Sequence, residues 1–436
     1  MQEPRSDQLP AHGRKHLVVQ LARFGDLVQT KRLLATLAAR PEAEVHLAVD
    51  RSLAGLAALL FPGVRVHALA AHAQGQADPG QALAENMPAF AALRGAGFHE
   101  VYNLNYSGLN FALSTLFDPA IVRGHRMENG QRLSGPWARM ALRWTRQRRF
   151  AGLNLVDYWA ELADDPLPPG MVNPVARRGG GGVGLVLAGR NARRSLPPRT
   201  LALLAGAVVQ GTGASRVVLL GSRAERAAAK ELLALMPRAL RDMTRDMVGA
   251  TDWRGLLDAL DGLDALLTPD TGTMHLAAHL GVPVHAFFLS SAWCFETGPY
   301  GLGHRVWQAD MDCAPCLETS PCPIGTRCAR AFSGRDLLRH LAGNPAFETP
   351  EGLTGYVSAF DPLGLTFRAV LGPDPEAERR RQFRTLMAGV LGRPMPGVVD
   401  PELAREFLPE EDWMLPGAAK PHTTMEFLDF QEKVQA

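Results

Sequence analysis

The segment from Asp270 to His275, which reads Asp-Thr-Gly-Thr-Met-His, has the residues best suited to hold an anion. A strand is predicted before it and a helix from Thr271 onward. The free N–H groups of a first helical turn, together with the positive end of the helix dipole, bind phosphate. The hydroxyls of Thr271 and Thr273 would add donors beside Gly272, so the string as a whole predicts a phosphate site. Asp270 taken alone is equally consistent with an ordinary helix N-cap.

A second carboxylate, Asp26, stands where the first predicted strand gives way to the first predicted helix. The local sequence is Arg23-Phe-Gly25-Asp26, and Gly25 allows both a sharp turn and the close approach of a substrate. A carboxylate facing an anion site is suited to remove a proton from an attacking hydroxyl group. Asp26 is therefore the candidate general base, and its alternative role is again that of a helix N-cap.

Parallel strands joined by helices are predicted to position both carboxylates. Short apolar runs rich in β-branched residues alternate with helical spacing, which is the pattern of parallel α/β layers. Ligands bind at the carboxyl ends of such strands, and both motifs directly follow a strand. The strands are predicted at residues 16–21, 45–49, 64–67, 100–104, 183–187, 217–220, 265–267 and 284–288.

The chain has 436 residues, of which 46% are hydrophobic, and a formal net charge of +2. Its length predicts two or three domains, and its balanced charge argues against nucleic acid as a partner. No apolar run is long enough for a membrane-spanning helix and the N-terminus lacks a secretory signal, so we expect a cytoplasmic protein. A stretch rich in Pro and Gly at residues 166–182 predicts a flexible linker between two α/β blocks.

Four cysteines lie close together in the pattern Cys313-x2-Cys316-x5-Cys322-x5-Cys328. In a reducing compartment, four clustered thiols can form a tetrahedral site for zinc or for a single iron. The alternative is an ordinary reduced loop. A site closed by four thiolates has no open position for catalysis, so the metal would be structural. The fifth cysteine, Cys294, is predicted to be a buried apolar residue.

The two carboxylate motifs resemble those of glycosyltransferase family 9, the ADP-heptose:lipopolysaccharide heptosyltransferases. Arg23-x-Gly25-Asp26 is similar to the opening motif of the family, and Asp270-Thr271-Gly272 with His275 is similar to its donor-phosphate motif. Glu225 is similar to the acidic residue that binds the nucleotide ribose. Arg194 stands where the family often has the Lys of a Lys-x-Trp-Pro string, and an Arg can hold a diphosphate bidentately.

The resemblance covers roughly residues 14–340. It implies an α/β fold of the GT-B type, in which two Rossmann-like domains face a central cleft. Residues 1–175 would then bind the acceptor through Arg23 and Gly25, and residues 176–341 would bind an ADP-sugar. The C-terminal extension, residues 342–436, has no counterpart that we can name, and one basic helix is predicted in it at residues 375–391.

The implied reaction is inverting and uses no catalytic metal. Asp26 would deprotonate the acceptor hydroxyl, which would attack the anomeric carbon of the sugar, while the helix start at Thr271 and a cation would hold the departing diphosphate. The leading hypothesis is transfer of a heptose from ADP-heptose to a lipopolysaccharide inner-core acceptor.

Three other functions remain open from the sequence. A protein O-heptosyltransferase with a metal-bound cysteine loop would use the same donor, since some members of the family that modify proteins carry a similar loop. A sugar-nucleotide epimerase would need no acceptor, and a metal-stapled scaffold would have no catalysis. Residues 123–149 contain eight arginines with two tryptophans. This stretch is consistent with peripheral contact with the inner membrane, with an anionic acceptor, or with a solvated basic helix.

Overall fold

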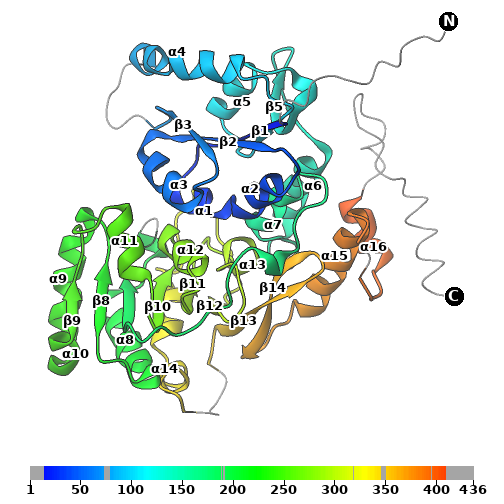
Figure 1. The fold of residues 1–436 in the computed structure, drawn as a ribbon. Helices are drawn as coiled ribbons and strands as arrows, with labels where there is room; N and C mark the ends of the chain where they lie inside the picture. Colours follow the sequence, from blue (N-terminus) through cyan, green and yellow to red (C-terminus); the bar gives the residue numbers. More distant parts are fainter. Residues whose placement is uncertain are drawn as a thin grey trace, which may run out of the picture. The chain divides into compact units, whose positions relative to one another are not determined.

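The computed structural model describes residues 14–72, 79–187, 189, 192–317, 319–344, 350–393 and 395–408. The chain divides into two compact units (Figure 1). Unit 1 comprises Met1–Ala22 and Leu33–Ser134, and unit 2 comprises Arg23–Arg32 and Gly135–Ala436. Each unit is built on a largely parallel sheet with helices, which confirms the prediction of an α/β fold with two parallel-sheet domains.

Unit 1 holds a six-stranded sheet in the order β3-β2-β1-β4-β5-β6. The first five strands are parallel, and β6 pairs antiparallel with β5. Apolar side chains of β1 and β2 are almost fully buried, as expected for strands covered on both faces. The strands are β1 (Lys15–Gln20), β2 (Glu44–Asp50), β3 (Arg65–Leu69), β4 (Glu100–Asn103), β5 (Val122–Glu128) and β6 (Gln131–Ser134), and the helices include α3 (Ala54–Leu60), α4 (Pro79–Gly95) and α5 (Gly108–Ser114).

Unit 2 holds an eight-stranded sheet in the order β14-β13-β12-β11-β10-β7-β8-β9. The strand order reverses direction between β7 and β10, which is the point where open α/β sheets bind ligands. The six parallel strands are β7 (Val183–Val186), β8 (Val217–Leu220), β9 (Thr244–Asp246), β10 (Ala265–Pro269), β11 (Val284–Phe288) and β12 (Arg305–Ala309). The helices that follow them include α8 (Pro198–Thr212), α9 (Arg226–Leu235), α11 (Trp253–Leu260), α12 (Gly272–His279) and α14 (Arg335–Leu341).

Helix α1 (Phe24–Gln29) follows β1 in the chain, yet it belongs to unit 2 because it packs on α12. The contact is close: a Cβ on Gly25 would lie 3.2 Å from the Cα of Gly272, and a Cβ on Gly272 would overlap the Phe24 ring. Glycine at both positions therefore lets the two helix starts approach each other. Helix α2 (Lys31–Ala38) begins directly after α1 and leads back into unit 1.

The C-terminal extension is integrated into unit 2. Strands β13 (Leu353–Asp361) and β14 (Gly364–Leu371) continue its sheet in antiparallel pairing. Helix α15 (Ala377–Val390) confirms the helix predicted at 375–391 and, with α16 (Pro401–Phe407), shares a buried core with α6 (Pro136–Trp144) (Figure 1). The bounds of the two units therefore differ from the predicted segments 1–175, 176–341 and 342–436.

The interpretation of the four glycines at 179–182 as part of a flexible linker is wrong. The backbone N–H groups of Gly180 and Gly182 donate to the carboxylate of Asp264, at 2.9 and 3.0 Å. A Cβ on Gly179 would overlap the backbone of Gly262. These glycines are packed against the loop before β10, and their lack of side chains is what permits that contact.

Candidate functional site

The start of α12 lies directly after β10, at the carboxyl edge of the unit 2 sheet. Thr271 is the N-cap, and its hydroxyl oxygen accepts the N–H of Met274 at 3.3 Å. The same hydroxyl lies 2.9 Å from that of Thr268, which itself donates to the carbonyl of Pro269. Because the Thr271 hydroxyl is engaged in this way, the backbone N–H groups of the first turn are the groups best placed to meet an anion.

Asp270 is buried one residue before the cap, so the alternative that it is the helix N-cap is wrong. Its carboxylate forms an ion pair with Arg194 and accepts the hydroxyl of Thr297 at 3.1 Å. The pKa of Asp270 is raised to about 6, mainly by burial and to a smaller extent by the negative charges of Asp26 and Glu296, while Arg194 and the Thr297 hydroxyl oppose the shift. Asp270 therefore fixes the Arg194 guanidinium beside the helix start.

Asp26 lies in the first turn of α1, half-buried. Its carboxylate accepts the backbone N–H of Arg23, the N-cap residue, at 3.0 Å. The alternative that Asp26 is the helix N-cap is therefore wrong, because Arg23 is the N-cap and Asp26 is the third residue of the helix. The structure also places Asp26 near enough to Asp270 for its charge to act on that residue. Arg23 itself is exposed, and Gly25 packs against α12.

His275 is buried on the first turns of α12, with Nε2 3.9 Å from Oδ1 of Asp270. Burial and the charges of Lys31 and Arg194 lower the pKa of His275 to about 3, so its imidazole is neutral. One turn further on, His279 Nδ1 lies 2.8 Å from Nζ of Lys31, and burial lowers the pKa of Lys31 well below its usual range. His279 thus packs within the α1–α2 and α12 contact rather than at the helix start.

Glu225 lies after β8 on the same edge of the sheet as Asp270, because β8 and β10 both flank β7. Its carboxylate accepts the backbone N–H of Ser222 and stabilises a single turn before α9. Its predicted role stays a prediction.

The four clustered cysteines lie between β12 and α14. Cys313 is exposed, Cys316 and Cys322 are half-buried, and Cys328 is buried. Burial and the neighbouring Cys316 raise the pKa of Cys313, whereas the N–H of Thr326, which donates to Cys322 Sγ at 3.2 Å, lowers the pKa of Cys322. Over the described part of the chain, no three His, Cys, Asp or Glu side chains are arranged to hold a metal ion. Cys294 is fully buried, as predicted.

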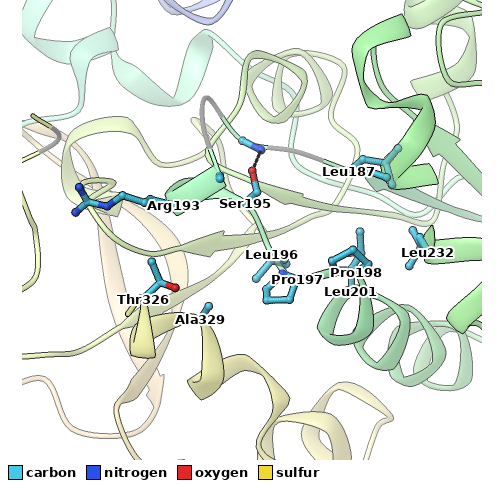
Figure 2. Close-up of a pocket in the computed structure, with 13 residues that line it drawn as sticks. Leu187, Arg193, Ser195, Leu196, Pro197, Pro198, Leu201, Leu232, Thr326 and Ala329 are labelled. Carbon is cyan, nitrogen blue, oxygen red and sulfur yellow. Dashed lines mark hydrogen bonds between the residues drawn. The ribbon is translucent and has the colours of Figure 1, made fainter. Parts of the chain in front are cut away.

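A cavity of about 440 Å³ lies between the loop after β7, the helices α8 and α9, and the cysteine loop (Figure 2). Its wall is mainly apolar, and Leu187 and Leu232 lie across the view of Figure 2 from Arg193 and Thr326. Arg194 is not among its lining residues, since it pairs with Asp270. The residues on either side of Arg194 in the chain, Arg193 and Ser195, do line the cavity.

Several arginines of the basic stretch at 123–149 have partners within their own unit. Arg148 forms two hydrogen bonds with Glu296, at 2.7 and 2.6 Å, and Arg149 forms an ion pair with Asp310 at 2.9 Å. Arg148 thereby braces the short helix α13 (Cys294–Thr297), which carries Thr297 to Asp270. Within the described ranges, the chain has no helix with the length and apolar character needed to cross a bilayer.

Sequence reasoning did not find Thr297, Glu296 or Phe24 as parts of the site. Thr297 and Glu296 lie on the short helix α13, which reaches Asp270 only through the tertiary fold. Phe24 lies inside the opening motif, but the sequence does not show that its ring covers Gly272. The presence of glycine at both 25 and 272 is the sequence signal that could have suggested a close contact here.

The two units, each built on a largely parallel α/β sheet, match the GT-B type of fold found in glycosyltransferases. The sequence profile of glycosyltransferase family 9 (heptosyltransferase) matches residues 202–323. This match confirms the resemblance to family 9, and the chain is a glycosyltransferase. No curated protein sequence matches the chain.

Solved structures of similar fold include ADP-heptose lipopolysaccharide heptosyltransferase II of E. coli. That likeness has a TM-score of 0.52 at 20% identity and covers 75% of this chain and 98% of that chain. The family 9 glycosyl transferase of Veillonella parvula gives 0.52 at 16% identity, covering 70% and 90%. The heptosyltransferase WaaC of E. coli with ADP gives 0.51 at 20% identity, covering 67% and 92%. At these identities the likeness establishes the fold.

Proposed function

We propose that the chain transfers a heptose from ADP-heptose to a hydroxyl group of a lipopolysaccharide inner-core acceptor. The observation that carries this proposal is the packing of α1 on α12, the helix that starts after Thr271, which brings Asp26 near enough to Asp270 for its charge to raise the pKa of that residue. A carboxylate next to an anion-binding helix start is the arrangement needed to activate an acceptor and hold a leaving diphosphate. The family 9 match and the names of the similar structures support heptose and ADP as the donor parts.

In the proposed reaction, a carboxylate oxygen of Asp26 takes the proton of the acceptor hydroxyl. The acceptor oxygen forms a bond to the anomeric carbon, and the bond from that carbon to the diphosphate oxygen breaks, with its electron pair leaving on ADP. The N–H groups of Gly272 and Thr273 and the Arg194 guanidinium would stabilise the negative charge that develops. Asp270 and Thr297 keep Arg194 and the helix start in place. His275 is neutral and can donate one N–H.

We further propose that the acceptor is lipid-linked and that the reaction occurs at the cytoplasmic face of the inner membrane. This part of the proposal follows from the choice of an inner-core acceptor. The basic stretch at 123–149 is not used as support, because Arg148 and Arg149 already have partners inside unit 2. A protein hydroxyl is the alternative acceptor. Supplying a purified inner-core oligosaccharide and a peptide acceptor in parallel, and comparing the mass of each after incubation, separates the two.

A structural zinc or iron at Cys313, Cys316, Cys322 and Cys328 is the remaining part of the proposal. The thiols lie near enough to perturb one another, and Cys322 accepts a backbone N–H of the kind that stabilises thiolates. We expect elemental analysis to find about one metal per chain, lost in Cys313→Ser but kept in the control Cys294→Ser. Folded wild-type protein without metal would reject this part and leave the transferase proposal intact.

Calorimetric titration with ADP, UDP and GDP tests the donor. We expect ADP to bind best and ADP-heptose to bind more tightly than ADP. A preference for UDP or GDP would overturn the choice of donor while keeping the fold. Binding of none of the three would overturn the proposed function and favour a scaffold.

A further inference from the structure

The C-terminal extension is connected to α1 through buried charged groups. Arg32, six residues after Asp26, has a side chain only 1% exposed. Its Nη1 donates to Asp157 at 2.7 Å, and its Nε donates to the carbonyl of Leu167 at 2.8 Å. Asp157 lies on α7 (Leu155–Ala160) and is fully buried. A buried carboxylate is stable only when a cation and several donors surround it, so Asp157 and Arg32 hold each other in one geometry.

The turn between β13 and β14 completes the shell of Asp157. The N–H of Leu365 donates to Oδ2 of Asp157 at 2.7 Å, and the hydroxyl of Tyr300 donates to Oδ1 at 2.6 Å. Gly364, at φ +135°, lies so close to Asp157 that a Cβ there would overlap the carboxylate. Glycine is therefore required both by the backbone conformation and by the contact.

Helix α15 holds the turn between β13 and β14 through an ion pair. Arg384, whose side chain is 3% exposed, donates twice to the carboxylate of Asp361, at 2.5 and 2.7 Å. Asp361 in turn accepts the backbone N–H groups of Leu363 and Gly364, at 2.9 and 3.1 Å. The bidentate pair thus determines where the turn presents the N–H of Leu365.

A second link from the extension reaches the same guanidinium. Arg393 donates twice to Glu161, at 2.7 and 2.5 Å, and Glu161 lies 3.5 Å from Nη2 of Arg32. The Glu161 side chain is 1% exposed, so little water screens these charges. The extension therefore orients two carboxylates, Asp157 and Glu161, and both of them interact with the Arg32 guanidinium.

We propose that the extension, residues 350–408, acts as a positioning element for α1: through Asp157, Glu161 and Arg32 it fixes where Asp26 stands beside α12. Arg32 belongs to the first turn of α2, which follows α1 after the single residue Thr30, so fixing Arg32 fixes the end of α1. The catalytic consequence rests on the proposed role of Asp26 as the base. Arg32, Asp157 and Arg384 touch no substrate in this account and act only on the geometry of α1.

The test compares two arginines of α15 in the full chain. Arg384→Gln removes the bidentate contact with the turn, whereas Arg381→Gln removes an exposed pair with Glu378 on the same helix and is the matched control. We expect hydrogen exchange of residues 24–30 to become about tenfold faster in Arg384→Gln and to stay unchanged in Arg381→Gln. Turnover should fall about tenfold or more while the Kd for ADP changes less than twofold, because misplacement of a catalytic group affects the chemical step.

Three further variants distinguish a positioning role of Arg384 from a general loss of stability. Arg384→Lys should restore most of the turnover, and Arg393→Gln, at a half-buried site, replaces Arg384→Gln if that variant does not fold. In an Asp26→Asn background, Arg384→Gln should cause no additional loss of the residual turnover, whereas general destabilisation would lower it further. Unchanged exchange of residues 24–30, or unchanged turnover despite faster exchange, would overturn the positioning role. Normal turnover of Asp26→Asn alone would instead overturn the proposed base and leave the exchange result standing.

Discussion

The starts of α1 and α12 resemble each other in sequence but use their carboxylates differently. In each, an Asp and a Gly follow a parallel strand. Asp270 is buried, precedes the cap and pairs with Arg194, whereas Asp26 lies within the first turn, half-buried, and accepts the N–H of Arg23. Burial with a fixed cation suits Asp270 to a holding role, and a less enclosed carboxylate suits Asp26 to proton transfer.

The largest effect is expected from the α1 side of the comparison. Asp26→Asn should lower turnover by about 10²- to 10⁴-fold, because a general base contributes on that order. The Kd for ADP should change little, since the groups that we propose to hold ADP lie on α12 and in the loop of Arg194. Asp252→Asn is the matched control, because Asp252 caps α11 in the same unit by accepting the N–H of Gly255 at 2.8 Å. Near-normal turnover in Asp26→Asn would contradict the role of Asp26 in proton transfer, and with it the proposed difference between Asp26 and Asp270.

The α12 side should respond in binding rather than in turnover. Arg194→Gln should weaken ADP binding by about 10- to 100-fold, because a hydrogen bond to a charged group contributes about 1.5–3 kcal/mol. Arg193→Gln, in the adjacent position that lines the cavity, is the control and should bind ADP normally. Calorimetry checks both. Equal ADP affinity in Arg194→Gln and wild type would show that Arg194 serves only Asp270.

The contact between the two helix starts can be tested at its glycines. Gly272→Ala places a Cβ into the Phe24 ring and should destabilise the protein by about 1–3 kcal/mol, with a lowered Tm and lowered turnover. Gly25→Ala meets its neighbours at 3.2 Å, so a smaller loss is expected. Thermal melting of both variants measures the difference. Equal effects would contradict the asymmetric packing.

Asp270 should also make the stability of the protein depend on pH. Its carboxyl group keeps a proton up to about pH 6 in the folded protein, compared with an ordinary pKa of 3.8. The folded state therefore binds more protons between about pH 4 and 6, and this residue's contribution to stability falls as the pH rises through that range and is level above it. In Asp270→Asn this decline in stability, about 3 kcal/mol for a pKa raised from 3.8 to about 6, should be absent. If the free energy of unfolding depended on pH in the same way in both proteins, the raised pKa of Asp270 would be contradicted.

Much of the fold follows from local sequence. All eight predicted strands occur, and most are short apolar runs that a parallel sheet buries on both faces, whereas β3 at the sheet edge is largely half-buried or exposed. Strand β9, which reads Thr-Arg-Asp, was missed because it is short and polar. The sequence analysis did not predict β13 and β14, because these two antiparallel strands mix apolar and polar residues and only β14 lies at the edge of the sheet.

The site was predictable only in part. Asp26 and Asp270 could be expected to approach each other because both follow strand ends and match a known pattern. That Thr297 holds Asp270, or that Asp157 holds Arg32, depends on residues 27 and 125 positions apart in the chain. Such pairings arise from the tertiary fold and leave no spacing that a single sequence reveals.

Acceptor-dependent transfer by the wild-type chain tests the central claim most directly. The protein would be incubated with ADP-heptose, with and without a purified heptose-free inner-core oligosaccharide, while released ADP and the mass of the oligosaccharide are followed. We expect rapid ADP release to require the acceptor, and we expect the acceptor to gain the mass of one heptose. ADP release at the same rate without acceptor, or an acceptor of unchanged mass, would contradict the central claim.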